Sequence, residues 1–211
     1  MTPVSLTVDG VAKEFNRRSI FRDVSFSLRS GESLAVTGRN GSGKSTLVKI
    51  ICGLLSPTRG SLAYVVDGKP IEVDALKDHI GLVSPYLQMY DEFTGLENLE
   101  VLSRIRADHD ITAALIADAL RNVGLWDRRN DFVRTYSSGM KQRLKYAFAM
   151  LHRPEVLILD EPTSNLDAEG IVMVERCVKE QSSRGMLIVA TNDSDEATWC
   201  SQRVVLGGER K

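Results

Sequence analysis

Residues 38–45 read GRNGSGKS, a glycine-rich loop that ends in a lysine and a hydroxyl residue. The loop matches the pattern G-x-x-x-x-G-K-[ST], and it lies between a predicted strand, Ser33–Thr37, and a predicted helix, Ser45–Leu55. Gly41 and Gly43 can adopt positive φ, so backbone N–H groups at the helix N-terminus can face an anion. We therefore predict a phosphate-binding loop. The residues expected to contact the bound molecule are Gly38, Arg39, Asn40, Gly41, Ser42, Gly43, Lys44, Ser45 and Thr46.

Within this loop, two side chains have specific predicted roles. Lys44 is expected to reach the terminal phosphates, and Ser45 to place its hydroxyl on Mg²⁺. The competing interpretation is an ordinary glycine-rich turn, which the flanking strand and helix argue against.

A second motif, VLILDE at residues 156–161, combines a continuous apolar run with two adjacent acids. Such a run is typical of a strand buried in a parallel sheet. Ligands of open α/β sheets bind at the carboxyl ends of the strands. Asp160 is therefore predicted to hold magnesium, and Glu161 to act as the general base on the attacking water. On its own the motif is weak, because many strands end in a solvated acid.

The remaining patterns predict an α/β fold. The first third of the chain alternates apolar and polar residues, as in Val4, Leu6 and Val8, which is typical of half-buried strands. The middle, from Thr94 to Leu151, has helical periodicity, and Met186–Ala190 repeats the pattern of a buried strand. Further strands are predicted at Leu62–Val66, Ile80–Val83 and Val204–Leu206, and a helix near Ile171–Gln181.

Composition limits the functional classes. The net charge is −1, which gives no electrostatic reason to expect nucleic acid. The three cysteines have no CxxC spacing, which favours reduced thiols in the cytosol over a disulfide framework. No apolar run reaches the roughly 18 residues that a membrane span needs, and the N-terminus lacks the features of a signal peptide.

A third motif carries a resemblance to a family. Residues 136–143 read YSSGMKQR, and PTSNLD follows the acid pair at residues 162–167. Together with the two motifs above, and in this order, they resemble the signature and D-loop of ATP-binding cassette (ABC) proteins over nearly the whole chain. The resemblance implies a P-loop NTPase core of the ABC type, with a mixed sheet, flanking helices, N-terminal antiparallel strands and an inserted helical subdomain. Residues 1–211 would form one nucleotide-binding domain, with its core at 1–84 and 154–211 and its insert at about 85–153.

The resemblance also implies a partner. In ABC proteins two cassettes pair head to tail, and each ATP lies between the phosphate loop of one chain and the signature of the other. Ser137, Ser138 and Gly139 would thus contact the nucleotide of a second copy, and Asp167 would lie at the dimer interface. Ser138 stands where a glycine is usual. Phe15 takes the place of the aromatic residue that stacks on adenine, and a strand-edge phenylalanine is the alternative.

Two positions depart from the family pattern. Pro85 occupies the usual glutamine position, so Gln88 is the candidate for the amide that faces water or magnesium, with a solvated loop residue as the alternative. Asn192 stands where the family has a histidine. Asparagine can donate a hydrogen bond to the terminal phosphate but carries no charge, so slower turnover is expected rather than none.

The function that the resemblance implies is that of an ATP-binding and ATP-hydrolysing subunit of an ABC transporter, using ATP and Mg²⁺. It would sit on the inner face of the cell membrane by binding separate transmembrane subunits, with residues 86–92 as the candidate contact, and nucleic acid is not expected. Similar short cassettes and YSSGM signatures occur in exporters of haem, lipid or polysaccharide, but neither feature fixes a substrate, so the substrate and the direction of transport stay open. Two alternatives stay open: a regulatory nucleotide binder with little hydrolysis, and a soluble ABC ATPase outside transport.

Overall fold

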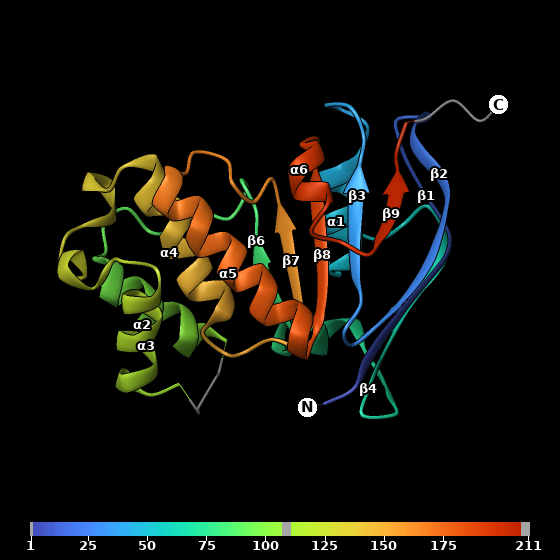
Figure 1. The fold of residues 1–211 in the computed structure, drawn as a ribbon. Coiled ribbons are helices and arrows are strands. Elements are labelled where there is room, and N and C mark those ends of the chain that lie inside the picture. Colours follow the sequence, from blue (N-terminus) through green and yellow to red (C-terminus); the bar gives the residue numbers. More distant parts are fainter. Residues whose placement is uncertain (1, 107–110, 208–211) are drawn as a thin grey trace.

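Two sheets organise residues 2–106 and 111–207, which are the residues that the computed structural model describes. The antiparallel sheet has the strand order β2-β1-β4-β5, and the parallel sheet has the order β6-β7-β8-β3-β9 (Figure 1). The strands are β1 (Val4–Phe15), β2 (Arg18–Arg29), β3 (Ser33–Thr37), β4 (Arg59–Val66), β5 (Lys69–Ile71), β6 (Ile80–Val83), β7 (Val156–Asp160), β8 (Met186–Thr191) and β9 (Gln202–Val205). The helices are α1 (Lys44–Ile51), α2 (Gly95–Ile105), α3 (Ala113–Asn122), α4 (Ser138–Met150), α5 (Ala168–Arg184) and α6 (Ser194–Ala197). This is the predicted α/β arrangement with antiparallel N-terminal strands.

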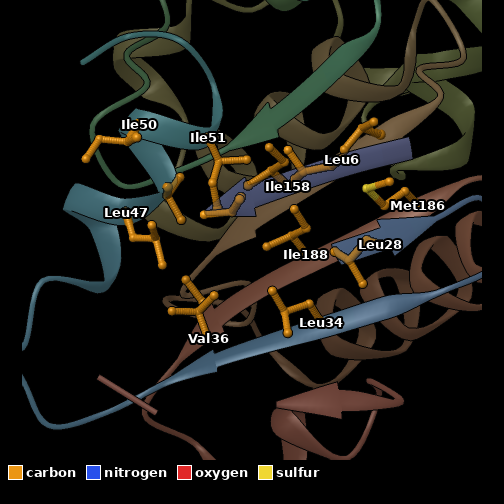
Figure 2. Close-up of a cluster of buried hydrophobic side chains, with 14 of the residues drawn as sticks. Leu6, Leu28, Leu34, Val36, Leu47, Ile50, Ile51, Ile158, Met186 and Ile188 are labelled. Atoms are coloured by element: carbon orange, nitrogen blue, oxygen red, sulfur yellow. The ribbon is translucent and has the colours of Figure 1, made fainter. Parts of the chain in front are cut away.

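The parallel sheet is buried on both faces. Since successive residues of a strand point to opposite sides of the sheet, alternate residues belong to different cores. On one face, Ile158 of β7 packs in a core shared with β1, β2 and α1. Figure 2 shows this core, with Leu6 of β1 and Leu47 of α1 near the parallel strands. On the other face, Leu157 and Leu159 pack in a second core with α2–α5. The continuous apolar runs of the sequence therefore serve two cores at once.

Helix α1 ends earlier than the sequence predicts. The expected range was Ser45–Leu55, but the helix ends at Ile51, with Cys52 as its C-cap. Gly53 follows at φ +72°; its N–H donates to the carbonyl of Ile50, and the next N–H donates to that of Lys49. These are the two bonds of a Schellman motif, in which a left-handed glycine stops the helix. The two leucines after Gly53 extended the apolar pattern beyond the true end.

Helices α2, α3 and α4 lie between β6 and β7 in the chain, within the predicted helical middle. The stretch from α3 to α4 instead contains turns and two short 3₁₀ helices, Trp126–Arg128 and Val133–Thr135, and a third 3₁₀ helix lies at Val73–Asp78. The predicted subdomain boundaries, near residues 85 and 153, stay a prediction. Residues 1, 107–110 and 208–211 of the predicted domain lie outside the described residues.

Smaller differences concern the ends of the chain's elements. β9 runs over Gln202–Val205, slightly before the predicted Val204–Leu206, and the three-residue β5 was not predicted.

Cys52, Cys177 and Cys200 are free thiols. Within the described part of the chain, no helix is both long and apolar enough to cross a bilayer.

Candidate active site

An open pocket of about 320 Å³ lies against the glycine-rich loop, at the sheet edge where β3 and β7 end on either side of β8. The parallel register of β3, β8 and β7 brings the loop after β3 to the same sheet edge as the acids that end β7. The pocket is lined by Ile20, Asn40, Gly41, Gly43, Lys44, Ser45, Thr46, Tyr86 and Glu161. The fold therefore brings the first two sequence motifs together.

Glycine is required at Gly43 for two reasons. Gly43 is the N-cap of α1 at φ +100°, in the left-handed region that side chains disfavour. A Cβ at this position would lie 2.6 Å from Cγ2 of Ile20 and 2.9 Å from Cδ1 of Phe21. The loop therefore packs directly on β2 at Gly43.

Lys44 joins the loop to the acids. Its side chain is only 6% exposed, and Nζ donates a hydrogen bond to the carbonyl of Gly38 at 2.9 Å. The same Nζ lies 3.7 Å from Oε1 of Glu161. A buried ammonium at the edge of an open pocket is suited to bind an anion.

Asp160 lies at the base of the site. It is 1% exposed, and Ser84 donates a hydrogen bond to its Oδ2 at 3.5 Å. Burial raises the pKa of this carboxyl, and the hydroxyls of Ser45 and Ser84 and the charges of Lys44 and Lys49 oppose that rise. Its second oxygen, Oδ1, is buried and has no hydrogen-bond partner among the described residues.

Glu161 has an unusual backbone. Its φ is +53°, a conformation uncommon for a residue with a side chain, and its N–H donates to the carbonyl of Ala190 at 2.9 Å. Strained residues of this kind cluster at functional sites. Burial raises the pKa of Glu161, while the ammonium of Lys44 lowers it.

Glu196 is a buried residue that the sequence did not single out. It is 5% exposed and accepts hydrogen bonds from the hydroxyls of Thr163 and Thr191 and, at 3.1 Å, from the N–H of Thr163. Thr163 follows Glu161 by two residues, and Thr191 precedes Asn192. Glu196 therefore ties the loop after β7, which begins with Glu161, to the end of β8, which precedes Asn192. An acid on a short helix gives no signal of this in the sequence.

Asn192 faces the glycine-rich loop. Its Nδ2 donates a hydrogen bond to Oδ1 of Asn40 at 3.1 Å, and its side chain is exposed. The amide is thus held beside the pocket by a neutral contact. Its predicted catalytic role stays a prediction.

The role predicted for Gln88, in the loop after β6, stays a prediction. Gln88 is exposed, whereas Tyr86 lines the pocket. The sequence could not distinguish them, because the amide of Gln88 matched the family's chemistry and its distance from Pro85 was the only guide. The predicted contact of residues 86–92 with a membrane partner stays a prediction.

The signature residues lie at the N-terminus of α4, outside the pocket lining. Ser137 caps the helix by accepting a bond from the N–H of Met140 at 3.2 Å, and both Ser137 and Ser138 are exposed. A Cβ on Gly139 would lie 3.1 Å from the carbonyl oxygen of Asn165. The exposed N-terminus of α4 is therefore packed against the loop that follows Glu161.

Asp167 ties that loop to α4 within the same chain. Its carboxylate accepts two bonds from Nη2 of Arg143, at 2.8 and 2.7 Å, and one from the N–H of Gly170 at 2.9 Å. The Gly170 bond is the main cause of its lowered pKa, with Arg143 adding to it. The side chain is exposed, so its predicted place at a dimer interface stays a prediction.

Phe15 lies at the end of β1, beside the turn formed by Asn16 and Arg17, both at positive φ. It is 45% exposed, and Nζ of Lys13 lies 4.8 Å from the ring centroid. The ring is outside the pocket lining, so stacking on a base stays a prediction.

Comparison with known proteins decides the family. Residues 21–164, more than half of the chain, match the protein family described as ABC transporter. The chain belongs to the ABC transporter family. As an ABC cassette it is similar to the dimeric bacterial ABC transporter cassette MJ0796, with a TM-score of 0.83 and 23% identity over 95% of this chain and 94% of that one. This similarity confirms the predicted fold class.

Two curated relatives extend the comparison. The linearmycin resistance ATP-binding protein LnrL of Bacillus subtilis (strain 168) is 34% identical over 89% of this cassette and 60% of its own length. The Nod factor export ATP-binding protein I of Rhizobium leguminosarum bv. viciae is 33% identical over 100% of this cassette and 69% of its own length. The cassette thus spans about two thirds of the relatives' length.

Proposed function

We propose that this cassette binds MgATP and hydrolyses it to ADP and phosphate, as the motor subunit of an ABC transporter. One observation carries the proposal. Lys44 of the phosphate-binding loop lies 3.7 Å from Glu161 in the lining of one pocket, with Asp160 buried beneath them. An anion-binding cation, a base and a second carboxylate thus meet at one sheet edge.

Magnesium fits the donor atoms of this site. Oδ1 of Asp160 is buried without a hydrogen-bond partner among the described residues, and the hydroxyl of Ser45 lies close enough to affect its pKa. Carboxylate and hydroxyl oxygens are suitable ligands for Mg²⁺, which usually takes one or two protein groups together with substrate phosphates. Asp160 and Ser45 would hold the ion, which when bound supplies positive charge to the phosphate oxygens.

The chain's own residues then have separate tasks. The N–H groups around Gly41 and Gly43 and the ammonium of Lys44 bind the phosphates. The carboxylate of Glu161 accepts a proton from the water that attacks the terminal phosphorus. General-base catalysis of this kind contributes roughly 10²- to 10⁴-fold in rate. Asn192 donates a neutral hydrogen bond to the terminal phosphate.

The proposal includes a second copy of the chain. Ser137, Ser138 and Gly139 would bind the terminal phosphate of the partner's nucleotide at the N-terminus of α4, a favourable position for an anion. Asp167 and the D-loop would contact the partner. The exposure of Ser137 and Ser138 and the dimeric state named for similar cassettes support this arrangement.

Separate transmembrane subunits would complete the transporter and hold the cassette at the inner face of the membrane. Residues 86–92 are the proposed contact. The names of the two curated relatives, which state linearmycin resistance and Nod factor export, favour an exporter, and we assign the choice of cargo to its membrane subunits.

Phosphate release by the purified cassette tests the proposed activity. MgATP should be hydrolysed by the unaltered protein, and Glu161→Gln should reduce the rate by at least about 100-fold while nucleotide binding is kept. Asp160→Asn should also lower the rate and should shift its dependence on Mg²⁺. A rate that Glu161→Gln leaves unchanged would refute the assignment of the base.

A regulatory nucleotide binder is the second candidate. It is favoured by Asn192, whose bond to Asn40 is neutral where the family has a histidine. This candidate predicts that MgATP binds but that phosphate release by the unaltered protein equals that of Glu161→Gln, both alone and with its membrane subunits.

A further inference from the structure

Tyr86 is the aromatic residue of the pocket lining, and it lies outside the three sequence motifs. It is 62% exposed although it is a large aromatic residue, and its side chain lines the pocket together with Lys44, Ser45 and Glu161. An exposed ring with a hydroxyl, in the same pocket lining as a lysine and a carboxylate, has room for a ligand to approach it. The loop thus presents a tyrosine to the pocket.

Two contacts hold Tyr86 in place. Nζ of Lys49 lies 3.9 Å from the centroid of its ring, in the position of a cation–π interaction. Its backbone N–H donates to Oγ of Ser84 at 3.3 Å, and Ser84 in turn donates to Asp160 at 3.5 Å. Lys49 also acts electrostatically on Asp160. The ring and the backbone of Tyr86 are therefore both connected to the predicted metal ligand.

These connections show which end of a bound nucleotide Tyr86 would face. Ser45, Asp160 and Glu161 gather at the carboxyl ends of the strands, where the proposed metal and the attacked phosphate belong. Tyr86 shares the pocket lining with Ser45 and Glu161. A phenolic hydroxyl can donate one hydrogen bond and accept others, so it can bind a phosphate oxygen.

We propose that Tyr86 is the substrate-contacting residue of this loop. Its hydroxyl donates a hydrogen bond to the terminal phosphate of ATP, and Lys49 fixes the ring that carries it. The residue thereby distinguishes triphosphate from diphosphate. This inference rests on the proposed nucleotide-binding function and assigns a chain-specific group to it.

Competitive binding tests the assignment without relying on turnover. Mg²⁺ complexes of ADP and of adenosine 5′-(β,γ-imido)triphosphate would displace a fluorescent methylanthraniloyl-ADP from the full chain. Tyr86→Phe keeps the ring and removes only the hydroxyl. It should weaken imidotriphosphate binding about 2- to 12-fold, the effect of one neutral hydrogen bond, and should change ADP binding by less than about twofold.

Tyr90→Phe is the matched control. Tyr90 belongs to the same loop, is 45% exposed and packs against Phe93 at a centroid distance of 5.4 Å, outside the pocket lining. Removal of the Tyr90 hydroxyl should leave the affinities for ADP and for the imidotriphosphate unchanged. Thermal unfolding of both variants should match that of the unaltered chain, because each site is exposed.

The outcomes separate the inference from the function beneath it. If Tyr86→Phe and the unaltered chain bound the imidotriphosphate equally well, the assignment of Tyr86 would be overturned, but not the proposed function. The same would follow if Tyr86→Phe lost as much affinity for ADP as for the imidotriphosphate. Failure of the unaltered chain to bind either nucleotide would overturn the proposed function and this assignment with it. The part assigned to Lys49 is tested by repeating Tyr86→Phe in a Lys49→Met chain. In the Lys49→Met chain, removal of the Tyr86 hydroxyl should reduce imidotriphosphate affinity by a smaller factor. An equal reduction with and without Lys49 would overturn the role assigned to Lys49.

Discussion

Replacing Glu196 by alanine should destabilise the fold and slow the reaction together. The carboxylate is 5% exposed and accepts bonds from two threonine hydroxyls and one N–H. In Glu196→Ala the hydroxyl of Thr191, which is fully buried, loses its acceptor, at a cost of about 1–3 kcal/mol. Thr163 is only partly buried, so water can replace part of its lost bonds. We expect a total loss of about 2–4 kcal/mol in the free energy of unfolding.

Urea unfolding measures this loss, since the midpoint shifts while the slope stays constant if the same surface is exposed. Asp195→Ala is the matched control, because it removes an exposed acid from the same short helix and should cost less than about 1 kcal/mol. Phosphate release should also fall in Glu196→Ala, because Thr163 follows Glu161 by two residues. The reasoning would be refuted if the two variants had the same unfolding midpoint.

Three further predictions concern the pocket itself. Gly43→Ala should weaken MgATP binding more than about tenfold, because its Cβ would lie 2.6 Å from Ile20, whereas Gly31→Ala, at φ +85° with open space around it, should leave the affinity unchanged in the same fluorescence titration. Asn192→His should raise phosphate release by up to about tenfold, since a charged donor contributes roughly 1–1.5 kcal/mol more than a neutral one, and a variant no faster than the parent would count against this role. The rate of hydrolysis should rise with pH through a midpoint above 4.5, the ordinary pKa of a glutamate, because burial raises the pKa of Glu161 and only its ionised form accepts a proton. A midpoint at or below 4.5 would contradict the assignment of Glu161 as the base.

Much of the fold could be predicted because its signals are local. The loop GRNGSGKS needs a strand before it and a helix after it, and β3 and α1 are found there. The run ending in Asp160 is buried at every position, as a strand covered on both faces must be. Lys44 and Glu161 could be paired in advance because parallel strands end at one edge of their sheet.

The structure differs from the sequence predictions where contacts that the local sequence pattern does not show decide the conformation. The apolar pattern continued past Ile51, but the left-handed Gly53 ends α1 by backbone hydrogen bonds that periodicity does not show. Tyr86 and Gln88 are two residues apart on one loop, and the ring of Tyr86 is held by Lys49 of α1, a contact with a distant part of the sequence. The sequence does not reveal Glu196 for the same reason, since its partners lie at the end of β8 and in the loop after β7.

The mass of the cassette with nucleotide tests most directly whether MgATP is held between two copies. Glu161→Gln should bind MgATP without turning it over, so any closed pair should persist long enough for light scattering. We predict that the mass rises from 23.4 kDa to twice that value with MgATP and stays at 23.4 kDa with MgADP. A mass that remains 23.4 kDa at saturating MgATP, with binding verified by fluorescence, would contradict the composite site.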